Sequence, residues 1–189
     1  MKKGIIFLCC LSVFALSLLS AQDANNPALK PMVSHFAARN FAPGVVTKAE
    51  LDLIVQAAIR APSAANRQPW HFTVVQNQSL ANKIVPNLTD GNVLIVISAQ
   101  GDGKTNGVQI LDSALAAESI YLAAQALGLG SRIYTGPIDN LNKNLKNDLS
   151  LPQGHNAIVL VRIGRLPPGV DAVSSASARN SPDQLVTYK

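Results

Sequence analysis

The sequence predicts one domain in which helices pack on a β-sheet, in an α+β or α/β arrangement. Three observations predict this fold class. Amphipathic helical segments alternate with short runs of β-branched residues, turns rich in glycine and proline separate them, and no internal repeat or long low-complexity segment interrupts the order. Residues 22–189 are long enough for a single domain with one substantial core.

The first 21 residues are expected to form a signal peptide. Met1-Lys2-Lys3 is a basic start, residues 4–19 are almost entirely apolar, and Ser20-Ala21 provides small residues for cleavage. The apolar run is shorter than the roughly 20 residues that span a bilayer. Cleavage after residue 21 is the favoured prediction and an uncleaved anchor is the alternative. In both cases we expect an exported, periplasmic protein that touches a membrane only through this segment.

The composition of residues 22–189 excludes several function classes. Both cysteines, Cys9 and Cys10, lie in the leader, so neither a disulfide framework nor thiol chemistry is expected. The formal charge of +5 falls to +3 without Lys2 and Lys3, and the remaining basic residues are scattered. Nucleic acid is therefore not an expected partner. The three histidines are too dispersed to predict a metal site.

The first half of the domain begins with helices. Residues 28–39 have a helical composition that ends before Pro43-Gly44. The spacing of Thr47 and Glu50 is typical of a capping box, and the apolar positions that follow predict a helix over about 47–60. Strands are expected at 72–75 and 93–98, with a short helix over 79–85 between them.

The second half contains the longest helical signal. Residues 107–127 are apolar or small around most of the helix and stop at Gly128, which predicts a buried central helix. A strand over 131–135, a polar helix over 139–149 and an apolar strand over 156–164 follow. The tail residues 185–188 are expected to add a strand to a partner's sheet edge, and a frayed terminus is the alternative.

The segment RAPSAANRQPWHF, residues 60–72, is unusual in this apolar chain. It follows a predicted helix and runs into a predicted strand, so it forms a loop that is held at both ends, where binding residues concentrate. Two prolines restrict it, while Ser63, Asn66 and Gln68 offer groups that both donate and accept hydrogen bonds. This set suits the edge of a neutral heteroaromatic ring. The alternative is a polar loop whose amides satisfy their own backbone.

This segment resembles the flavin-binding segment of the FMN-dependent nitroreductase family, whose pattern is roughly P-S-x-x-N-x-Q-P-W followed by a strand. Residues 62–70 match that pattern. DSALAAESIYLAAQALGLGS, residues 112–131, is similar to the family's central helix, and Ile163-Gly164-Arg165 resembles its final strand. The resemblance covers nearly all of residues 22–189.

The resemblance implies an α+β fold of three layers, α/β/α, with a mostly antiparallel central sheet. It also implies an intertwined homodimer that holds two FMN molecules at the subunit interface. The loop would reach the flavin from the partner chain, the Gly136-Pro137 turn would face the reactive ring nitrogen, and Arg179 would bind the phosphate. The implied cofactor-binding residues are His35, Arg39, Pro62, Ser63, Ala64, Asn66, Gln68, Gly136 and Arg179.

One stretch departs from the family pattern. The family's first helix carries a pattern like R-[RH]-S-x-[RK]-x-F, whose Arg and Ser contact the flavin phosphate and ribityl chain. Here Arg39 and Phe41 match, but His35 stands in place of the Arg and Ala37 in place of the Ser. Loss of one charge-assisted contact weakens binding by about tenfold to a hundredfold. A protonated His35 would restore part of that charge.

The resemblance implies an exported FMN-dependent oxidoreductase that reduces planar acceptors such as nitroaromatics and quinones, with NAD(P)H as a candidate electron donor. The cofactor would carry the chemistry, so no catalytic side chain is predicted. Nicotinamide cofactors are not expected outside the cytoplasm, so either the electron donor is not NAD(P)H or the protein binds flavin for another purpose. The alternative function is therefore a noncatalytic flavin-binding or scavenging protein, which the missing phosphate contacts at His35 and Ala37 favour. A weaker hypothesis is a phosphate loop at residues 98–105, where a mobile glycine-rich loop near the substrate opening is the favoured interpretation.

Overall fold

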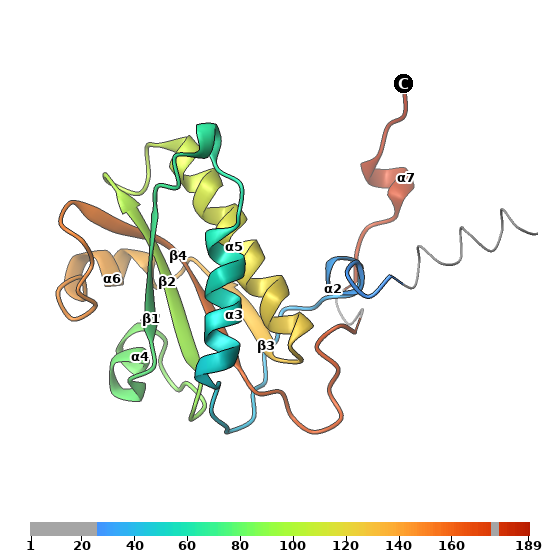
Figure 1. Ribbon diagram of the computed structural model, residues 1–189, viewed down its shortest axis with the longest axis horizontal. Coiled ribbons are helices and arrows are strands. Elements are labelled where there is room, and N and C mark those ends of the chain that lie inside the picture. The colour runs from blue at the N-terminus through green and yellow to red at the C-terminus, as the bar shows by residue number, and fades with distance from the viewer. Residues whose placement is uncertain (1–25, 175–177) are drawn as a thin grey trace, which may run out of the picture.

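The computed structural model describes residues 26–174 and 178–189, and a four-stranded antiparallel sheet forms its middle layer (Figure 1). The strand order is β1-β2-β4-β3. The strands are β1 (Trp70–Val75), β2 (Val93–Gln100), β3 (Gly130–Tyr134) and β4 (His155–Gly164). The two central strands are buried along almost their whole length, because helices cover both faces of the sheet.

One face of the sheet packs against the two longest helices, α3 (Lys48–Ile59) and α5 (Gly107–Ala126). Side chains that alternate along each strand point to this face, among them Ile95 and Ile97 of β2. They pack with apolar side chains of the helices, such as Ile54 and Ile120. In Figure 1 the two helices lie side by side across the strands.

The intervening side chains of the strands, such as Leu94 and Val96, form a second core on the other face. Two short helices cover it, α4 (Gln78–Ile84) and α6 (Ile138–Asn144). The expected three-layer α/β/α architecture with an antiparallel sheet is therefore confirmed. The helix expected over 139–149 is shorter than predicted, since α6 ends at Asn144.

Local sequence sets where the helices start. Thr47 and Glu50 form the expected capping box at the start of α3, and Asn77 and Asn106 cap α4 and α5 with their side chains. Such caps contribute about 1 kcal/mol each. Glu50 also accepts two hydrogen bonds from Arg165, at 2.7 and 2.8 Å. Burial raises the pKa of Glu50, but the hydrogen bonds from Arg165 and Thr47 outweigh that effect and lower it.

The prediction of a helix over 28–39 is wrong for most of that range. Only α2 (Lys30–Val33) is helical, and residues 36–41 run extended toward the sheet. The buried amide of Gln125 explains this path, because it accepts from the Phe36 N–H and donates to the Phe36 carbonyl, at 3.3 and 3.2 Å. The Ala38 N–H donates to the Ser131 carbonyl at 3.0 Å. Hydrogen bonds to Gln125 and Ser131 thus take the place of the backbone hydrogen bonds that a helix would form here.

Gly130 makes room for this extended segment. A Cβ atom at this position would lie 3.0 Å from the Ala38 Cβ, 3.0 Å from the Phe41 ring and 2.6 Å from the Leu166 side chain. Contacts this short are not tolerated in a packed interior. Gly130, the first residue of β3, therefore lets the segment that contains Ala38 and Phe41 pack closely against this strand.

The C-terminal segment projects away from the rest of the chain (Figure 1). It contains α7 (Pro182–Leu185), and residues 186–189 have no regular structure within the single chain. The strand expected at 185–188 is thus absent from the isolated chain, where Leu185 and Tyr188 are 68% and 92% exposed. Pairing with a partner remains a prediction. The expected signal segment, residues 1–21, lies outside the described residues.

Among residues 26–174 and 178–189, no helix has the length and apolar character that crossing a membrane requires.

Candidate functional site

The loop at residues 62–68 adopts an unusual backbone. Its centre is a one-turn 3-10 helix, η1 (Ala64–Asn66), between α3 and β1. Ala65, Asn66 and Gln68 have φ angles of 51°, 52° and 49°. This left-handed conformation costs an L-residue about 1–2 kcal/mol. Three such residues within four positions need support from other parts of the chain.

Two side-chain oxygens hold this backbone, in addition to the backbone hydrogen bonds of the turn itself. The Ala64 N–H donates to Oδ1 of Asp112 at 3.0 Å, and the Gln68 N–H donates to the Ser63 hydroxyl at 3.0 Å. Asp112 lies on α5 and is only 3% exposed. A hydrogen bond to a charged group contributes about 1.5–3 kcal/mol, which is comparable to the strain at one or two of these residues. The loop is therefore fixed before any ligand arrives.

The two amide side chains of the loop bond to each other and leave complementary groups open. Gln68 Nε2 donates to the backbone carbonyl of Asn66 at 3.3 Å and to its Oδ1 at 3.2 Å. Because a carbonyl can only accept, this contact fixes the orientation of the Gln68 amide. Asn66 Nδ2, a donor, and Gln68 Oε1, an acceptor, take no partner among the described residues.

The alternative of a self-satisfied polar loop holds for part of this segment, and binding of a ring edge stays a prediction. Ser63 and Ala64 use groups inside the fold, as the alternative requires, and the Ala64 N–H is not available to a ligand. Asn66 and Gln68 are exposed and keep a donor and an acceptor free. Pro62 is exposed at the start of the loop. A donor and an acceptor side by side match the alternating edge of a neutral heteroaromatic ring.

A second group of predicted residues meets at the other end of α5. His35 Nδ1 lies 3.1 Å from the Pro31 carbonyl, and its Nε2 lies 3.4 Å from NH2 of Arg179. The carbonyl can only accept and the guanidinium can only donate, so the ring carries its hydrogen on Nδ1 and accepts at Nε2. The structure thus brings together two residues 144 positions apart that both belong to the implied phosphate site.

The expectation that a protonated His35 supplies the missing charge stays a prediction. In this arrangement the imidazole lies against the Arg179 guanidinium and orients it. The edge of Tyr121 packs against the same ring, with centroids 5.4 Å apart. Burial raises the pKa of the Tyr121 phenol, so this neighbour stays neutral. Arg179 is the permanent cation in the contact between His35 and Arg179.

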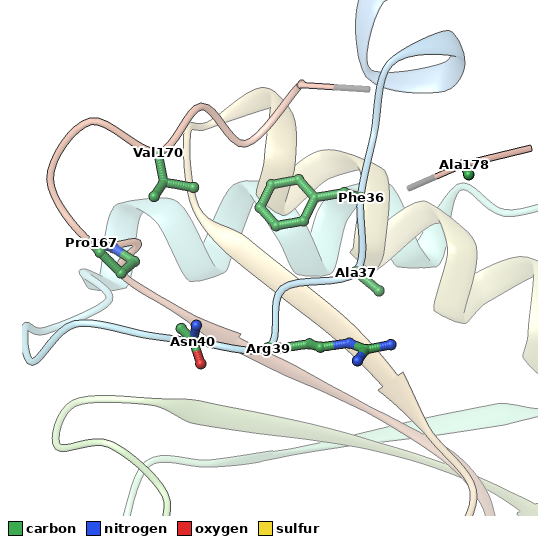
Figure 2. A pocket seen from close by; sticks show the side chains of 7 residues that line it. All are labelled: Phe36, Ala37, Arg39, Asn40, Pro167, Val170 and Ala178. Carbon is green, nitrogen blue, oxygen red and sulfur yellow. The ribbon is translucent and has the colours of Figure 1, made fainter. Parts of the chain in front are cut away.

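An open pocket of about 480 Å³ lies beside this pair (Figure 2). Arg39 and Ala37 line it from the extended segment, and Pro167 and Val170 line it from the chain after β4. Phe36, Asn40 and Ala178 complete the lining. Figure 2 shows the Arg39 side chain extending away from Pro167. The guanidinium of Arg39 is exposed and lies where a ligand in the pocket could reach it.

The two groups of predicted residues lie far apart in one chain. Asp112 holds the loop near the start of α5, while Gln125 holds Phe36 near its end. Gln125 follows Asp112 by thirteen positions along the helix, which corresponds to about 20 Å. Gly136 belongs to neither group and lies in an exposed turn before α6, where its N–H has no partner among the described residues.

Two histidines meet beside the loop. The rings of His71 and His155 are 6.2 Å apart, edge to face, and His155 Nδ1 lies 3.3 Å from the Ser98 hydroxyl. His155 is half-buried at the start of β4. Burial and the neighbouring charges of His71 and Lys146 lower the pKa of His155, and the hydrogen bond to Ser98 only partly opposes this.

The hypothesis of a phosphate loop at residues 98–105 is wrong. The carboxylate of Asp102 accepts from the backbone N–H groups of Lys104 and Thr105, at 2.8 and 2.9 Å. These are the donors that a phosphate would need. The Lys104 ammonium is bound to Asp139 at 2.9 Å. The hydrogen bonds from the Lys104 and Thr105 N–H groups lower the pKa of the Asp102 carboxyl, so a negative charge already lies where a phosphate would bind.

Sequence reasoning missed the two residues that hold both ends of the site, Asp112 and Gln125. Both are buried polar side chains among the mostly apolar buried residues of α5. A polar residue in such a face is expected only where it has a hydrogen-bonding partner. A polar residue at a position that the helical pattern predicts to be buried was the available signal, but the sequence does not show which distant group forms the hydrogen bond.

Comparison with known proteins agrees with this geometry. A model of the nitroreductase family matches residues 33–92 and 78–165. The chain is 30% identical over 167 residues to a protein of Archaeoglobus fulgidus named "Putative NADH dehydrogenase/NAD(P)H nitroreductase", and the match covers 83% of this chain and 95% of the relative.

Solved structures share the fold. An FMN-dependent nitroreductase of Clostridium difficile R20291 superposes with a TM-score of 0.67 at 26% identity, over 85% of this chain and 98% of the other. A nitroreductase with bound FMN from Desulfitobacterium hafniense gives a TM-score of 0.71 at 22% identity, over 87% and 98%. With the family model matched across most of the described domain, the chain belongs to the nitroreductase family.

Proposed function

We propose that this protein is an FMN-dependent oxidoreductase that works as a homodimer and is exported to the periplasm. The observation that carries the proposal is the loop at residues 62–68, which is held in a strained conformation and leaves one donor and one acceptor open. Strain that the surrounding structure maintains is typical of binding sites. Relatives named as NAD(P)H nitroreductases and neighbours named for bound FMN support the choice of cofactor.

The residues present fit FMN. Asn66 and Gln68 would bind the polar edge of the ring, and the exposed N–H of Gly136 would face the ring from the turn. Arg39 would neutralise the negative charge that develops at the pyrimidine edge on reduction. Arg179, oriented by His35, would bind the phosphate with its planar guanidinium. When bound, FMN would supply the two-electron chemistry, and the protein would supply position and electrostatics.

A homodimer is proposed because one chain does not bring the two groups of residues together. Val108, Leu111 and Leu115 form an apolar stripe on α5, and they are 47%, 60% and 36% exposed in the single chain. The central helix expected to be buried is thus open on one side. A two-fold axis beside this stripe would cover it and would place the loop of one chain near His35 and Arg179 of the partner. The exposed tail offers a second contact.

The stripe provides a test of the dimer. Leu111→Arg should give a monomer that no longer retains FMN, because a buried charge without a partner is costly in an interface. Val45→Arg is the matched control, since Val45 is 71% exposed and precedes α3, remote from the stripe. Molecular mass in solution and bound flavin are measured together. A wild-type monomer that binds FMN, or a Leu111→Arg dimer, contradicts the assembly.

The proposed substrates are planar acceptors such as quinones and nitroaromatics, which stack on a flat ring. The proposed reaction is ping-pong, with the donor and the acceptor using the same open face in turn. Purified protein should show the visible absorption of bound flavin. Under anaerobic conditions NADH, NADPH or dithionite is added, and a quinone is then supplied. Bleaching by a donor followed by recovery with the quinone supports the oxidoreductase, and protein that stays colourless with excess FMN contradicts it.

The second candidate is a flavin-binding protein without turnover. Two observations favour it, because Ala37 offers no hydroxyl and His35 stands where the family pattern has a permanently charged arginine. The same anaerobic experiment separates the two functions. Bound flavin that dithionite reduces, but that neither nicotinamide reduces nor a quinone reoxidises, favours the noncatalytic protein. Secretion of an epitope-tagged full chain into the periplasmic fraction, compared with a chain that lacks residues 1–21, tests the proposed location.

A further inference from the structure

The backbone of the binding loop depends on a side chain that is remote in sequence. Ser63 is the N-cap residue of η1, and an N-cap side chain normally accepts from a backbone N–H inside the turn. The Ser63 hydroxyl is instead used as the acceptor for the Gln68 N–H, and η1 has no local side-chain cap. The Ala64 N–H is capped by Asp112, which is 48 residues later in the sequence and lies on the second turn of α5.

This contact is the direct link between the loop and the rigid interior. Asp112 is 3% exposed and lies in the protein interior, whereas residues 64–68 are exposed. A carboxylate is a stronger acceptor than a hydroxyl or amide, and in a buried position its charge is costly unless a donor remains in place. Opening the loop would remove that donor from Asp112. The buried carboxylate therefore opposes relaxation of the left-handed residues.

We propose that Asp112 is a positioning residue for ligand recognition, which keeps Asn66 and Gln68 in the geometry that binds the ring edge. It touches no ligand itself and acts through the Ala64 N–H. The inference rests on the proposed flavin function for the identity of the ligand, but the restraint on the loop is a property of the empty protein. The two parts can therefore be tested separately.

The neighbouring residue provides a matched control. Ser113 is fully buried on the same helix, and its hydroxyl has no hydrogen-bonding partner among the described residues. Ser113→Ala removes a buried polar atom of α5 without affecting the loop. Asp112→Ala removes the acceptor, and Asp112→Asn keeps an oxygen acceptor of the same shape but loses the charge. The three variants separate restraint of the loop from packing of the helix.

The first measurement is amide hydrogen exchange of residues 62–70 in the FMN-free protein, well below the melting temperatures of all variants. In Asp112→Ala we expect faster exchange confined to this segment, with Asp112→Asn between it and wild type and Ser113→Ala unchanged. Exchange in residues 62–70 that is the same in wild type and Asp112→Ala overturns the proposal. Equal acceleration in Asp112→Ala and Ser113→Ala also overturns it.

The second measurement is the FMN dissociation constant, from quenching of flavin fluorescence. Asp112→Ala is expected to weaken binding by about tenfold to a hundredfold, with partial rescue in Asp112→Asn, whereas Ser113→Ala stays within about twofold of wild type. Wild-type affinity in Asp112→Ala overturns the positioning role. If the wild-type protein binds no FMN, the proposed function fails, and the exchange measurement still decides whether Asp112 restrains the loop.

Discussion

The two ends of α5 hold the two halves of the candidate site by different means. At the start of the helix, a buried carboxylate and a hydroxyl fix three left-handed residues, so the loop is built within one chain. At the other end, His35 and Arg179 meet in a single long contact of 3.4 Å between segments from opposite ends of the chain. The proposed ring-binding loop is thus preorganised, whereas the proposed phosphate site is held together by few groups.

The departure from the family pattern affects only one end of the candidate site. His35 and Ala37 both lie at the phosphate end, and the loop end matches the pattern at every named position. A change that weakens the phosphate contact should therefore leave ring recognition intact. Flavins with and without a phosphate group distinguish the two ends in solution.

The largest effect is expected from Arg179→Ala. Arg179 is the one cation in the His35 contact, and loss of a charge-assisted hydrogen bond costs about 1.5–3 kcal/mol, or about tenfold to a hundredfold in FMN affinity. Riboflavin, which has no phosphate, should bind almost unchanged. Titration of both ligands measures this, with Arg60→Ala as a control for loss of an exposed arginine. An equal loss for both ligands would place Arg179 at the ring instead.

His35→Arg should act in the opposite direction. A guanidinium in place of the imidazole adds a permanent charge beside Arg179, and we expect FMN to bind about tenfold more tightly, with riboflavin unaffected. Repulsion between the two arginines should lower the stability of the FMN-free protein, and bound phosphate should relieve it. The test compares melting temperatures with and without inorganic phosphate. A variant whose FMN affinity falls would show that His35 orients Arg179 better than a second charge replaces it.

A smaller effect is expected from Ala65→Gly in the strained loop. Glycine adopts a φ of 51° without the cost of about 1–2 kcal/mol, but it loses about 0.5–1 kcal/mol in chain entropy. The free energy of unfolding should therefore rise slightly, by up to about 1 kcal/mol. Ala114→Gly, at an exposed helical position of α5, should lower it by about 1 kcal/mol. Urea denaturation measures both, and equal losses would mean that the loop is not strained.

The smallest effect concerns pH at the loop end. His155 has a folded pKa below its ordinary value of 6.5, so the unfolded chain binds more protons as the pH falls through that range. The contribution of neutral His155 to the free energy of unfolding is fully present above pH 6.5, and it is lost as the pH falls toward the folded pKa. His155→Gln should flatten this part of the profile. Denaturation at several pH values measures it, with His35→Gln as the control at the phosphate end.

Much of the fold could be predicted because its signals are local. The capping residues Thr47 and Asn77, the apolar run of β2 and the glycines after α5 each act within a few residues of where they stand. Strands β1 and β2 were still predicted too short, since β1 begins at Trp70 instead of Phe72 and β2 ends at Gln100 instead of Ser98. Pairing of Trp70 with Ala99 lengthens both strands, and that pairing depends on a neighbour that is remote in sequence.

The sequence by itself determined the order of helices and strands, the layered fold and the loop that carries Asn66 and Gln68, because periodicity, caps and turn residues act over short stretches of chain. Tertiary structure alone decided that residues 36–41 run extended, that Asp112 caps Ala64 and that His35 meets Arg179. Each of these is a hydrogen bond between groups 48 to 144 residues apart. Which distant donor meets which acceptor is fixed only when the packed core places them together.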